Sequence, residues 1–571
     1  MAEISIKNPR EGIAQSPHVG YGDIRNLDLH SIPGIVRLNN ITVKKSGTII
    51  TALPQWIVKN PLKPTEFWTV SSLGLVYKST DSGVTWSAVT GNTHTFTVTI
   101  ASPAVVSATA HGFTTNDRVI FTTTGALPTG LVAGKVYYII STGLTADAFQ
   151  LAATLGGAAI NTSGSQSGTH SFLTNGAGLA IWKDYLFVPR ASSLDVYGPL
   201  TLSPTWTLNW KKIDTDGLWH PMIISKNDFK LYGGADKYVF SLDEATAPFV
   251  PATSASYTFT QQALDLPFNY RIKCLEELGN NLMCGTWQGT NVYDLRIADI
   301  FPWDRSATSF GQPVIMSENG VHAMLNIGNS LIVLAGVDGK IYICDGVNAT
   351  QIGQIPQSIA NIDGGKNIAY YPGAITNYKG RIFFGVSGNG TDTIGGMGVY
   401  SLLRTSKGNI LIHEHTISTL TDGTSNVVKI GALCGVIRDN ILIGWSDATP
   451  TASQGIDNIT NTSYLYTTDY SGYFESPFYT TGSLLQQTTP TEIEFNLVRP
   501  LRTGEGIRLA YRTDLTASYT TIGTYTFATE GAVVSVNKVY DFPPAEQIQF
   551  KVSLLGSATT SPEMKGVSIR W

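Results

Sequence analysis

Two histidines on either side of a glutamate, His413-Glu414-His415, have a spacing that could hold a metal ion. Residues two apart on a β-strand point to the same face, so both imidazoles could approach one ion. A zinc site needs at least a third protein ligand, and none is identifiable from the sequence. We therefore predict no metal centre, and we expect these residues to be exposed positions of a strand.

One short acidic segment has residue types that could bind calcium. Asp214-Thr-Asp-Gly217 resembles the start of a calcium loop. It is shortened to D-x-D-G, however, and it lacks the closing bidentate Glu. A turn held by Asx hydrogen bonds is the expected structure.

Several aromatic residues are close together in the sequence, namely Trp206, Trp210 and Trp219 with Tyr197 and His220. An exposed set of such rings could stack on sugar rings. Packing in a core or at an interface is favoured, because Trp is a large hydrophobic anchor in either setting.

No sequence motif indicates catalysis. The chain has no P-loop, G-x-S-x-G, H-E-x-x-H or dinucleotide fingerprint in its strand-turn-helix context. Its four cysteines form no C-x-x-C pair and are too few for a disulfide framework, so small buried side chains are expected. We predict no catalytic, cofactor-binding or metal-binding residue, no cofactor, and a protein that is not an enzyme.

The composition favours an all-β protein. Only 14% of the 571 residues are charged, against a usual share of about 25%, while glycine reaches 57 residues. Hydrophobic residues make up 42%, which excludes disorder as the main state. Exposed helix faces need Glu, Lys and Arg, and this chain has few of them.

The charge pattern does not indicate a nucleic-acid binder. The formal net charge is −4, and the basic pairs Lys44-Lys45 and Lys211-Lys212 are isolated, as is typical of solvated strand or turn positions. The chain starts without an apolar segment of signal-peptide length and has no run of about 18 apolar residues. We expect a soluble protein of a reducing compartment with no membrane span.

An apolar pattern recurs along the chain: a strand ending in Gly, a turn, and a second strand with an aromatic residue near its middle. The copies lie at 67–77, 186–197, 231–242, 282–295, 333–344, 382–402 and 441–466. Their second-strand aromatics are Tyr77, Tyr197, Phe240, Tyr293, Tyr342, Tyr400 and Tyr466. Most separations match the roughly 40–50 residues of a four-stranded propeller blade. The pattern predicts a β-propeller of about seven blades, in which the N-terminal strand could close one blade, and favours it over an array of β-sandwiches.

The remaining segments are predicted to be additional β-domains. Residues 93–172 hold four charged side chains among many Thr, Ala and Gly, and they account for the one long gap between repeats. From about residue 475 strands alternate polar and apolar residues over their whole length, which is typical of an antiparallel sandwich. We predict an N-terminal arm leading into the propeller (1–40), a first blade (41–92), an inserted β-domain (93–172), the remaining blades (173–474) and a C-terminal sandwich (475–571).

The segment Ser79-Thr-Asp-Ser-Gly-Val-Thr-Trp86 resembles the Asp-box of sialidase-like propellers. As a hairpin turn, it should use Asp81 to accept backbone N–H groups, Gly83 to supply a positive φ, and Trp86 to anchor the next strand. In the families that it resembles, the box lies away from the active site, and no arginine-bearing sialidase motif accompanies it here. We therefore predict a structural turn formed by Ser79, Asp81, Gly83 and Trp86.

Two stretches resemble structural proteins of bacteriophage tails. One is Gly12–Gly34 with Val36-Arg-Leu-Asn39, which is similar to the start of tail proteins of double-stranded DNA phages. The other is the insert, with Ala110-His-Gly-Phe, Asn116-Asp-Arg-Val, Thr124-Gly-Ala-Leu-Pro-Thr-Gly-Leu and a segment from Ala158 to His170, which is similar to a small β-domain of phage virion proteins. Together they cover less than a fifth of the chain.

A propeller with added β-domains in a virion protein resembles the nozzle, or tail tubular, proteins of short-tailed phages. The resemblance implies a homohexameric ring below an adaptor or portal-side protein, which continues the DNA-ejection channel and carries fibres or spikes. DNA would pass transiently and without sequence-specific binding, and the protein would be assembled in the host cytoplasm and located in the virion tail. The alternative is a tail adhesin or receptor-binding protein that recognises host surface glycan, with or without glycan-degrading activity.

Overall fold

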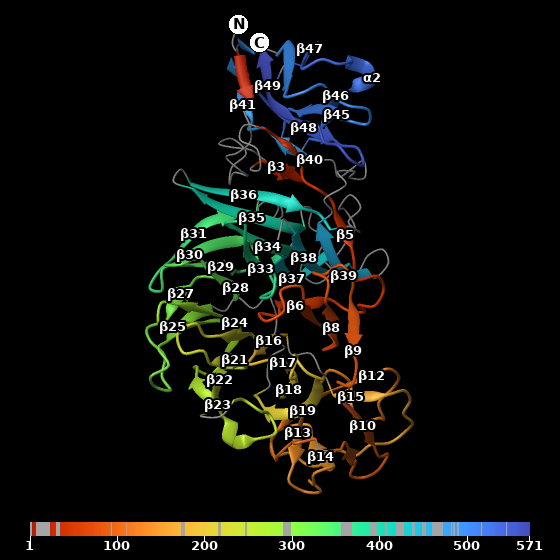
Figure 1. Ribbon diagram of the computed structural model, residues 1–571, viewed down its shortest axis with the longest axis vertical. Helices are drawn as coiled ribbons and strands as arrows, with labels where there is room; N and C mark the ends of the chain where they lie inside the picture. Colours follow the sequence, from red (N-terminus) through yellow and green to blue (C-terminus); the bar gives the residue numbers. More distant parts are fainter. Residues whose placement is uncertain are drawn as a thin grey trace.

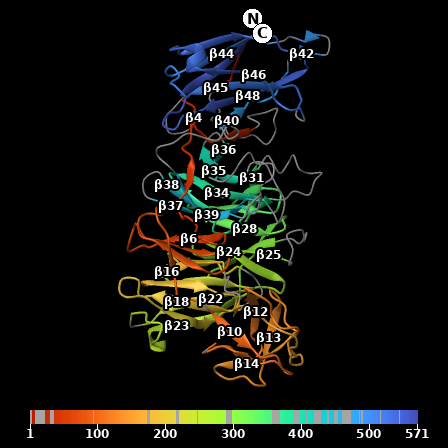
Figure 2. The ribbon, with the colours of Figure 1, turned by 90° about the vertical axis from the view of Figure 1, so that its right-hand side faces the viewer.

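The computed structural model describes residues 3–6, 23–29, 35–92, 94–109, 111–172, 177–214, 219–245, 248–288, 298–355, 368–388, 397–405, 408–417, 428–436, 440–447, 453–459, 472–480, 482–483, 486–487, 490–514, 517–543 and 545–570. These residues form β-strands with one 3-10 turn, Ser254–Ser256, and one short helix, α2 (Phe527–Glu530). Three bodies follow one another along the longest axis: a sandwich that holds both termini, a propeller, and a small barrel (Figures 1 and 2).

Seven four-stranded blades, counted over the described residues, form the β-propeller. The first four are blade I, β6–β9 (Pro54–Lys59, Phe67–Ser71, Val76–Ser79, Ser87–Val89); blade II, β16–β19 (Ala180–Trp182, Tyr185–Pro189, Ser193–Gly198, Thr205–Lys212); blade III, β20–β23 (Met222–Ile224, Leu231–Ala235, Tyr238–Glu244, Tyr257–Asp265); and blade IV, β24–β27 (Tyr270–Leu278, Asn281–Gln288, Ala298–Trp303, Val314–Met316). The others are blade V, β28–β31 (Val321–Asn326, Leu331–Ala335, Lys340–Cys344, Ala349–Gln354); blade VI, β33–β36 (Ile375–Tyr378, Arg381–Gly388, Gly398–Thr405, Gly408–His415); and blade VII, β37–β39 with β5 (Val428–Val436, Asn440–Asp447, Ser453–Ile459, Thr42–Lys44).

The N-terminal part of the chain closes the ring. Strand β5 is the outer strand of blade VII and pairs antiparallel with β39, with Lys44 opposite Asp457 and Thr42 opposite Ile459. The first blade therefore begins at Pro54 and not at residue 41 as the sequence predicts. Local sequence cannot reveal this, because the partner strand lies some 400 positions further along the chain.

The repeat pattern corresponds to the second and third strands of a blade. Tyr77, Tyr197, Phe240, Tyr342 and Tyr400 lie on the third strands β8, β18, β22, β30 and β35. In two blades the third strand is elsewhere than predicted, at Ala298–Trp303 and Ser453–Ile459. Tyr293 and Tyr466, which the sequence placed on these strands, lie outside the described residues. The register of the repeat was therefore wrong in blades IV and VII.

The segment between blades I and II forms a closed barrel in the order β10-β11-β14-β13-β12-β15. Its strands are Thr95–Val98, Val106–Ser107, Ala148–Ala152, Val136–Ile140, Arg118–Thr123 and His170–Phe172. The interior is filled by buried aromatic side chains, among them Phe96, Phe121, Tyr137 and Phe149. Because closure leaves no edge strand, the barrel needs few charges to protect its rim.

The C-terminal sandwich is built from both ends of the chain. One sheet has the order β1-β49-β44-β47 (Glu3–Ile6, Met564–Arg570, Glu492–Leu497, Ser535–Val539), so the two termini pair with each other. The other contains β40, β48, β45 and β46 (Gly472–Glu475, Gln547–Leu555, Gly506–Arg512, Thr520–Thr526), with β41 (Tyr479–Thr480) paired to β48. The arm that was predicted only to lead into the propeller is thus part of this sandwich.

One sheet runs without interruption from the propeller into the sandwich. Strand β2 (Asp23–Arg25) lies between β36, the outer strand of blade VI, and β40 of the sandwich. A short pair, β3 (Leu27–Asp28) and β4 (Arg37–Leu38), follows it. A single hydrophobic cluster includes Ile24 of the arm, Tyr400 of blade VI and Phe495 of the sandwich. The two bodies therefore share both backbone pairing and a core.

Candidate functional sites

The Asp-box segment forms the turn between β8 and β9. The Ser79 hydroxyl donates to Asp81 Oδ1 at 2.8 Å and accepts the Gly83 N–H at 2.9 Å. Asp81 Oδ1 also accepts the Thr85 N–H at 2.9 Å, and Oδ2 accepts the Thr85 hydroxyl at 2.6 Å. Burial alone would raise the pKa of Asp81, but these hydrogen bonds hold that pKa below its usual range. All four polar contacts stay within the turn.

The same turn joins the first blade to the last. Trp86 is buried, its indole N–H donates to the Gly83 carbonyl at 3.2 Å, and it shares a hydrophobic cluster with Tyr77 of blade I and Leu442 of blade VII. Gly83 has φ +85°, and a Cβ there would lie 2.3 Å from Leu442 Cδ2. The turn therefore supports ring closure by packing, and its geometry is that of a structural element.

The histidine pair on β36 is buried, so the expectation of an exposed position was wrong. His413 Nε2 donates to the Met397 carbonyl at 3.2 Å, and burial lowers the pKa of His415 to about 4. Glu414 is bound by Arg381, and it accepts the Asn39 side-chain N–H at 2.9 Å. Blade VI itself and Asn39 of the arm thus supply the partners of these polar residues. No group of three or more His, Cys, Asp or Glu side chains gathers as a metal site among the described residues.

The aromatic residues near position 210 belong to separate places. The Trp206 indole donates to the Thr90 carbonyl at 2.9 Å, and its ring lies 4.6 Å from that of Tyr197 at the seam of blades I and II. Trp210 lies between blades II and III, with its ring 5.7 Å from Phe249. These residues therefore do not form one cluster, and Trp206 and Trp210 pack at interfaces between blades, as predicted.

Trp219 marks the axis of the propeller. It directly precedes the first strand of blade III, and its ring lies 5.8 Å from that of Tyr371, which precedes blade VI on the opposite side of the ring. Lys273 of blade IV has its ammonium group 5.1 Å from the Trp219 ring and donates to His322 Nδ1 at 2.7 Å. Burial lowers the pKa of Lys273 to about 7. Side chains from opposing blades thus meet across the axis.

The cysteines, Asp214 and His220 were also singled out in the sequence. The four cysteines are free, three buried and Cys434 half-buried, as expected for small internal residues. Residues 215–217 of the predicted Asx turn lie outside the described part, and Asp214 accepts from Gln261 and Gln262 at 3.2 Å. His220 is buried, and its Nδ1 donates to the Gly234 carbonyl at 3.0 Å.

Within the described ranges no helix is long and apolar enough to cross a membrane.

Buried charges fix the barrel to blade II, and the sequence reasoning missed them. Asp195 on β18 is fully buried and binds His94, at the start of the barrel, and Arg190, each at 2.7 Å. Burial would raise the pKa of Asp195, but these two partners hold it below its usual range. A second ion pair joins Lys212 of blade II to Asp117 of the barrel. The one signal available was an Asp in the middle of an apolar strand, since a buried charge needs a partner.

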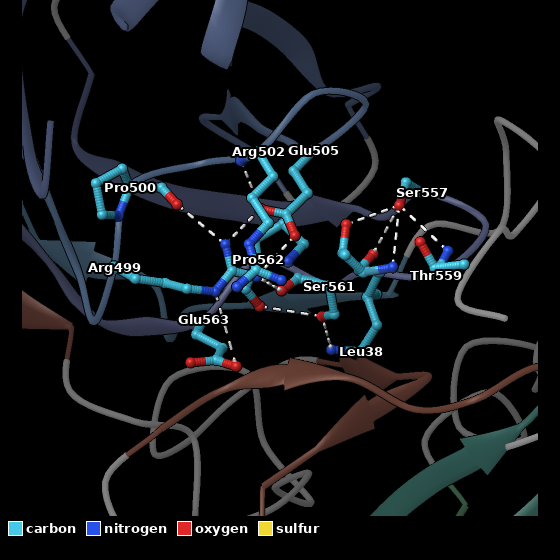
Figure 3. Close-up of polar contacts among 11 residues, drawn as sticks. Leu38, Arg499, Pro500, Arg502, Glu505, Ser557, Thr559, Ser561, Pro562 and Glu563 are labelled. Carbon is cyan, nitrogen blue, oxygen red and sulfur yellow. Dashed lines mark hydrogen bonds and ion pairs between the residues drawn. The ribbon is translucent and has the colours of Figure 1, made fainter. Parts of the chain in front are cut away.

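A second network fixes the arm to the sandwich (Figure 3). Arg499 makes two parallel hydrogen bonds to Glu505, at 2.9 and 2.7 Å, and donates to the Ser561 carbonyl at 2.7 Å. The Ser561 hydroxyl in turn accepts the Leu38 N–H of the arm at 2.8 Å. Bidentate Arg–carboxylate pairs are geometrically specific, so this network sets the position at which β4 docks.

Comparison with known proteins adds little to this geometry. No family model and no curated protein matches the chain. Among solved structures, YCF48 bound to D1 peptide shares 9% identity over 77% of this chain and 98% of its own, with a TM-score of 0.39. A computationally designed protein, Ika8, shares 12% over 74% of this chain and 99% of its own (TM-score 0.35), and an exo-β-1,3-galactanase from Phanerochaete chrysosporium shares 7% over 63% and 96% (TM-score 0.25). Such likenesses carry no functional argument, and the all-β propeller is defined by the strand pairing described above.

Proposed function

We propose that this chain is a structural component of a bacteriophage tail, a nozzle-type subunit that forms a homohexameric ring. In this proposal, the ring binds an adaptor or portal-side protein, continues the DNA-ejection channel and carries fibres or spikes. It is assembled in the host cytoplasm and resides in the virion. The proposal rests on the resemblance of residues 12–39 and 93–172 to phage virion proteins, together with the way the three bodies are joined.

The observation that supports the proposal most is the continuity of the molecule along its long axis. A sheet passes from blade VI through β2 into the sandwich, and both chain ends pair in that sandwich. A contact between the buried side chains of His94 and Asp195 and an ion pair between Lys212 and Asp117 hold the barrel at the other end. A subunit that must transmit force in a tail needs such joints, because a flexible linker would let each body move alone.

The filled propeller axis also fits a ring. Because Trp219 and Tyr371 meet across the axis, DNA would have to pass between copies and not through one propeller. A net charge of −4 suits a channel wall, since a strongly basic wall would hold DNA by its phosphates.

The mass of the purified protein, measured by light scattering, tests the proposal against its alternative. Six copies support the ring, whereas three copies favour a tail adhesin that recognises host glycan. A monomer at all concentrations tested would contradict both oligomeric assignments. Degradation of host capsule polysaccharide by the purified protein would overturn the non-enzymatic assignment.

A further inference from the structure

A cavity of about 480 Å³ lies between the barrel and the propeller. The barrel side includes Arg118, Tyr138 and Leu155, and the propeller side includes residues 212–214, 236–238 and 268–271 of blades II to IV. Connections from one blade to the next and hairpins between second and third strands lie at one face, because neighbouring strands are antiparallel. The cavity therefore opens on the face that carries the insert, whereas the Asp-box turn, between a third and a fourth strand, lies on the other face.

The charges around the cavity largely neutralise one another. Its lining has four basic residues and three acidic ones. Asp117, only 3% exposed, pairs with Lys212, and Arg271 Nε lies 3.7 Å from Asp236 Oδ1. The Lys237 ammonium group lies 2.5 Å from Asp265 outside the cavity. A strongly charged ligand such as a nucleic acid would need a cluster of uncompensated cations, which this lining does not offer.

Aromatic rings also contribute to the walls. The Arg118 guanidinium lies 5.8 Å from the Tyr138 ring, and the Lys237 ammonium lies 4.7 Å from the Tyr238 ring. The Tyr270 hydroxyl donates to Asp299 at 2.7 Å, which fixes its ring. At the rim, Phe268 is 82% exposed on the propeller side, and Leu155 is 63% exposed on the barrel side. Two large apolar side chains thus face solvent on opposite walls of one cavity.

We propose that this cavity binds a short neutral saccharide, a role beyond the structural one proposed above and independent of it. Sugars present apolar C–H faces that pack on aromatic and aliphatic side chains, and hydroxyls that both donate to carboxylates and accept from ammonium and guanidinium groups. The cavity offers both kinds of surface, and its largely neutralised charges require no charge on the ligand. Its volume lies within the usual range for small-ligand sites.

Titration calorimetry of the full-length protein tests this proposal. The probes are trisaccharides of glucose, galactose and N-acetylglucosamine, with a sialylated trisaccharide and a single-stranded DNA oligonucleotide as acidic comparisons. We expect at least one neutral trisaccharide to bind with a Kd in the millimolar range or tighter, and neither acidic probe to compete.

Two exposed rim residues provide variants that should fold. Phe268→Ser and Leu155→Ser should each weaken binding at least about tenfold if the ligand spans both walls, a loss of about 1.4 kcal/mol. The matched control is Phe229→Ser, a 68% exposed phenylalanine between first and second strands, on the opposite face of blade III. It should leave binding unchanged. The proposal is overturned if no neutral probe binds at about 10 mM, if only the acidic probes bind, or if neither rim variant weakens binding more than the control.

Discussion

Replacing Gly83 by alanine should destabilise the propeller at the point where its ring closes. Gly83 has φ +85°, and an alanine Cβ would lie 2.3 Å from Leu442 Cδ2 of blade VII. The left-handed backbone costs an L-residue about 1–2 kcal/mol. Forcing an extra carbon into a packed core costs about 1–3 kcal/mol more. We therefore expect the free energy of unfolding to fall by about 2–5 kcal/mol in total.

A matched glycine separates backbone strain from packing. Gly47 has φ +57°, and a Cβ there meets no atom within 4 Å, so Gly47→Ala should lose only the backbone part, about 1–2 kcal/mol. The assay is equilibrium unfolding in urea followed by tryptophan fluorescence, with the slope checked for constancy. Combining Gly83→Ala with Leu442→Ala should cost about 1–3 kcal/mol less than the sum of the two single variants, because the overlap is gone. If Gly83→Ala lowers the free energy of unfolding no more than Gly47→Ala does, the turn does not pack against blade VII as described.

The other predictions concern the joints and the buried histidines. Asp195→Asn leaves His94 and Arg190 without their carboxylate and should lower the free energy of unfolding by about 3–5 kcal/mol. Amide hydrogen exchange should speed up in β10 and β18 but not in blade V. The exposed barrel variant Asp147→Asn should change neither the free energy of unfolding nor the exchange rates. Ile24→Pro removes a backbone N–H from the pairing of β2, at a cost of about 1–3 kcal/mol for the partner left unsatisfied, and should split thermal unfolding into separate transitions of sandwich and propeller. A single unchanged transition would refute the shared sheet. Burial lowers the pKa values of His220 and His415 from 6.5 to about 4. Between these pH values both histidines are protonated in the unfolded chain and neutral in the folded chain. These two histidines should therefore add no slope above pH 6.5 and should lower the stability between pH 6.5 and 4, by about 3 kcal/mol each. In His220→Asn this slope should be shallower, whereas an equal slope would show that the ring titrates freely.

The blades could be predicted because each one is local in sequence. The apolar strand ending in Gly and the following aromatic strand are hairpin partners, as Leu231 opposite Leu242 illustrates, and such pairs leave a period that is visible in one sequence. That the N-terminal strand could close a blade was foreseen, but its partner could not be predicted, since Thr42–Lys44 pairs with Asp457–Ile459 and no local pattern records so distant a partner.

The buried joints were missed for a related reason. The alternation around His413-Glu414-His415 is typical of a strand with one solvent-exposed face. In the structure, Arg381 of blade VI and Asn39 of the arm both bind Glu414, and these distant partners leave no local pattern. Asp195 likewise looks like an ordinary strand residue until the barrel brings His94 against it. The roles of the turn residues Ser79, Asp81 and Gly83 could be predicted, because their polar partners lie within a few positions of them in the sequence.

The proposed ring around the tail axis is tested most directly by the position of this chain in the virion. Phage particles would carry a tag in the exposed Thr154–Gly157 turn of the barrel and be imaged with a gold-labelled binder by electron microscopy. We expect six labels arranged around the tail axis below the adaptor. Labels at the tips of fibres or spikes, or particles without label, would contradict it.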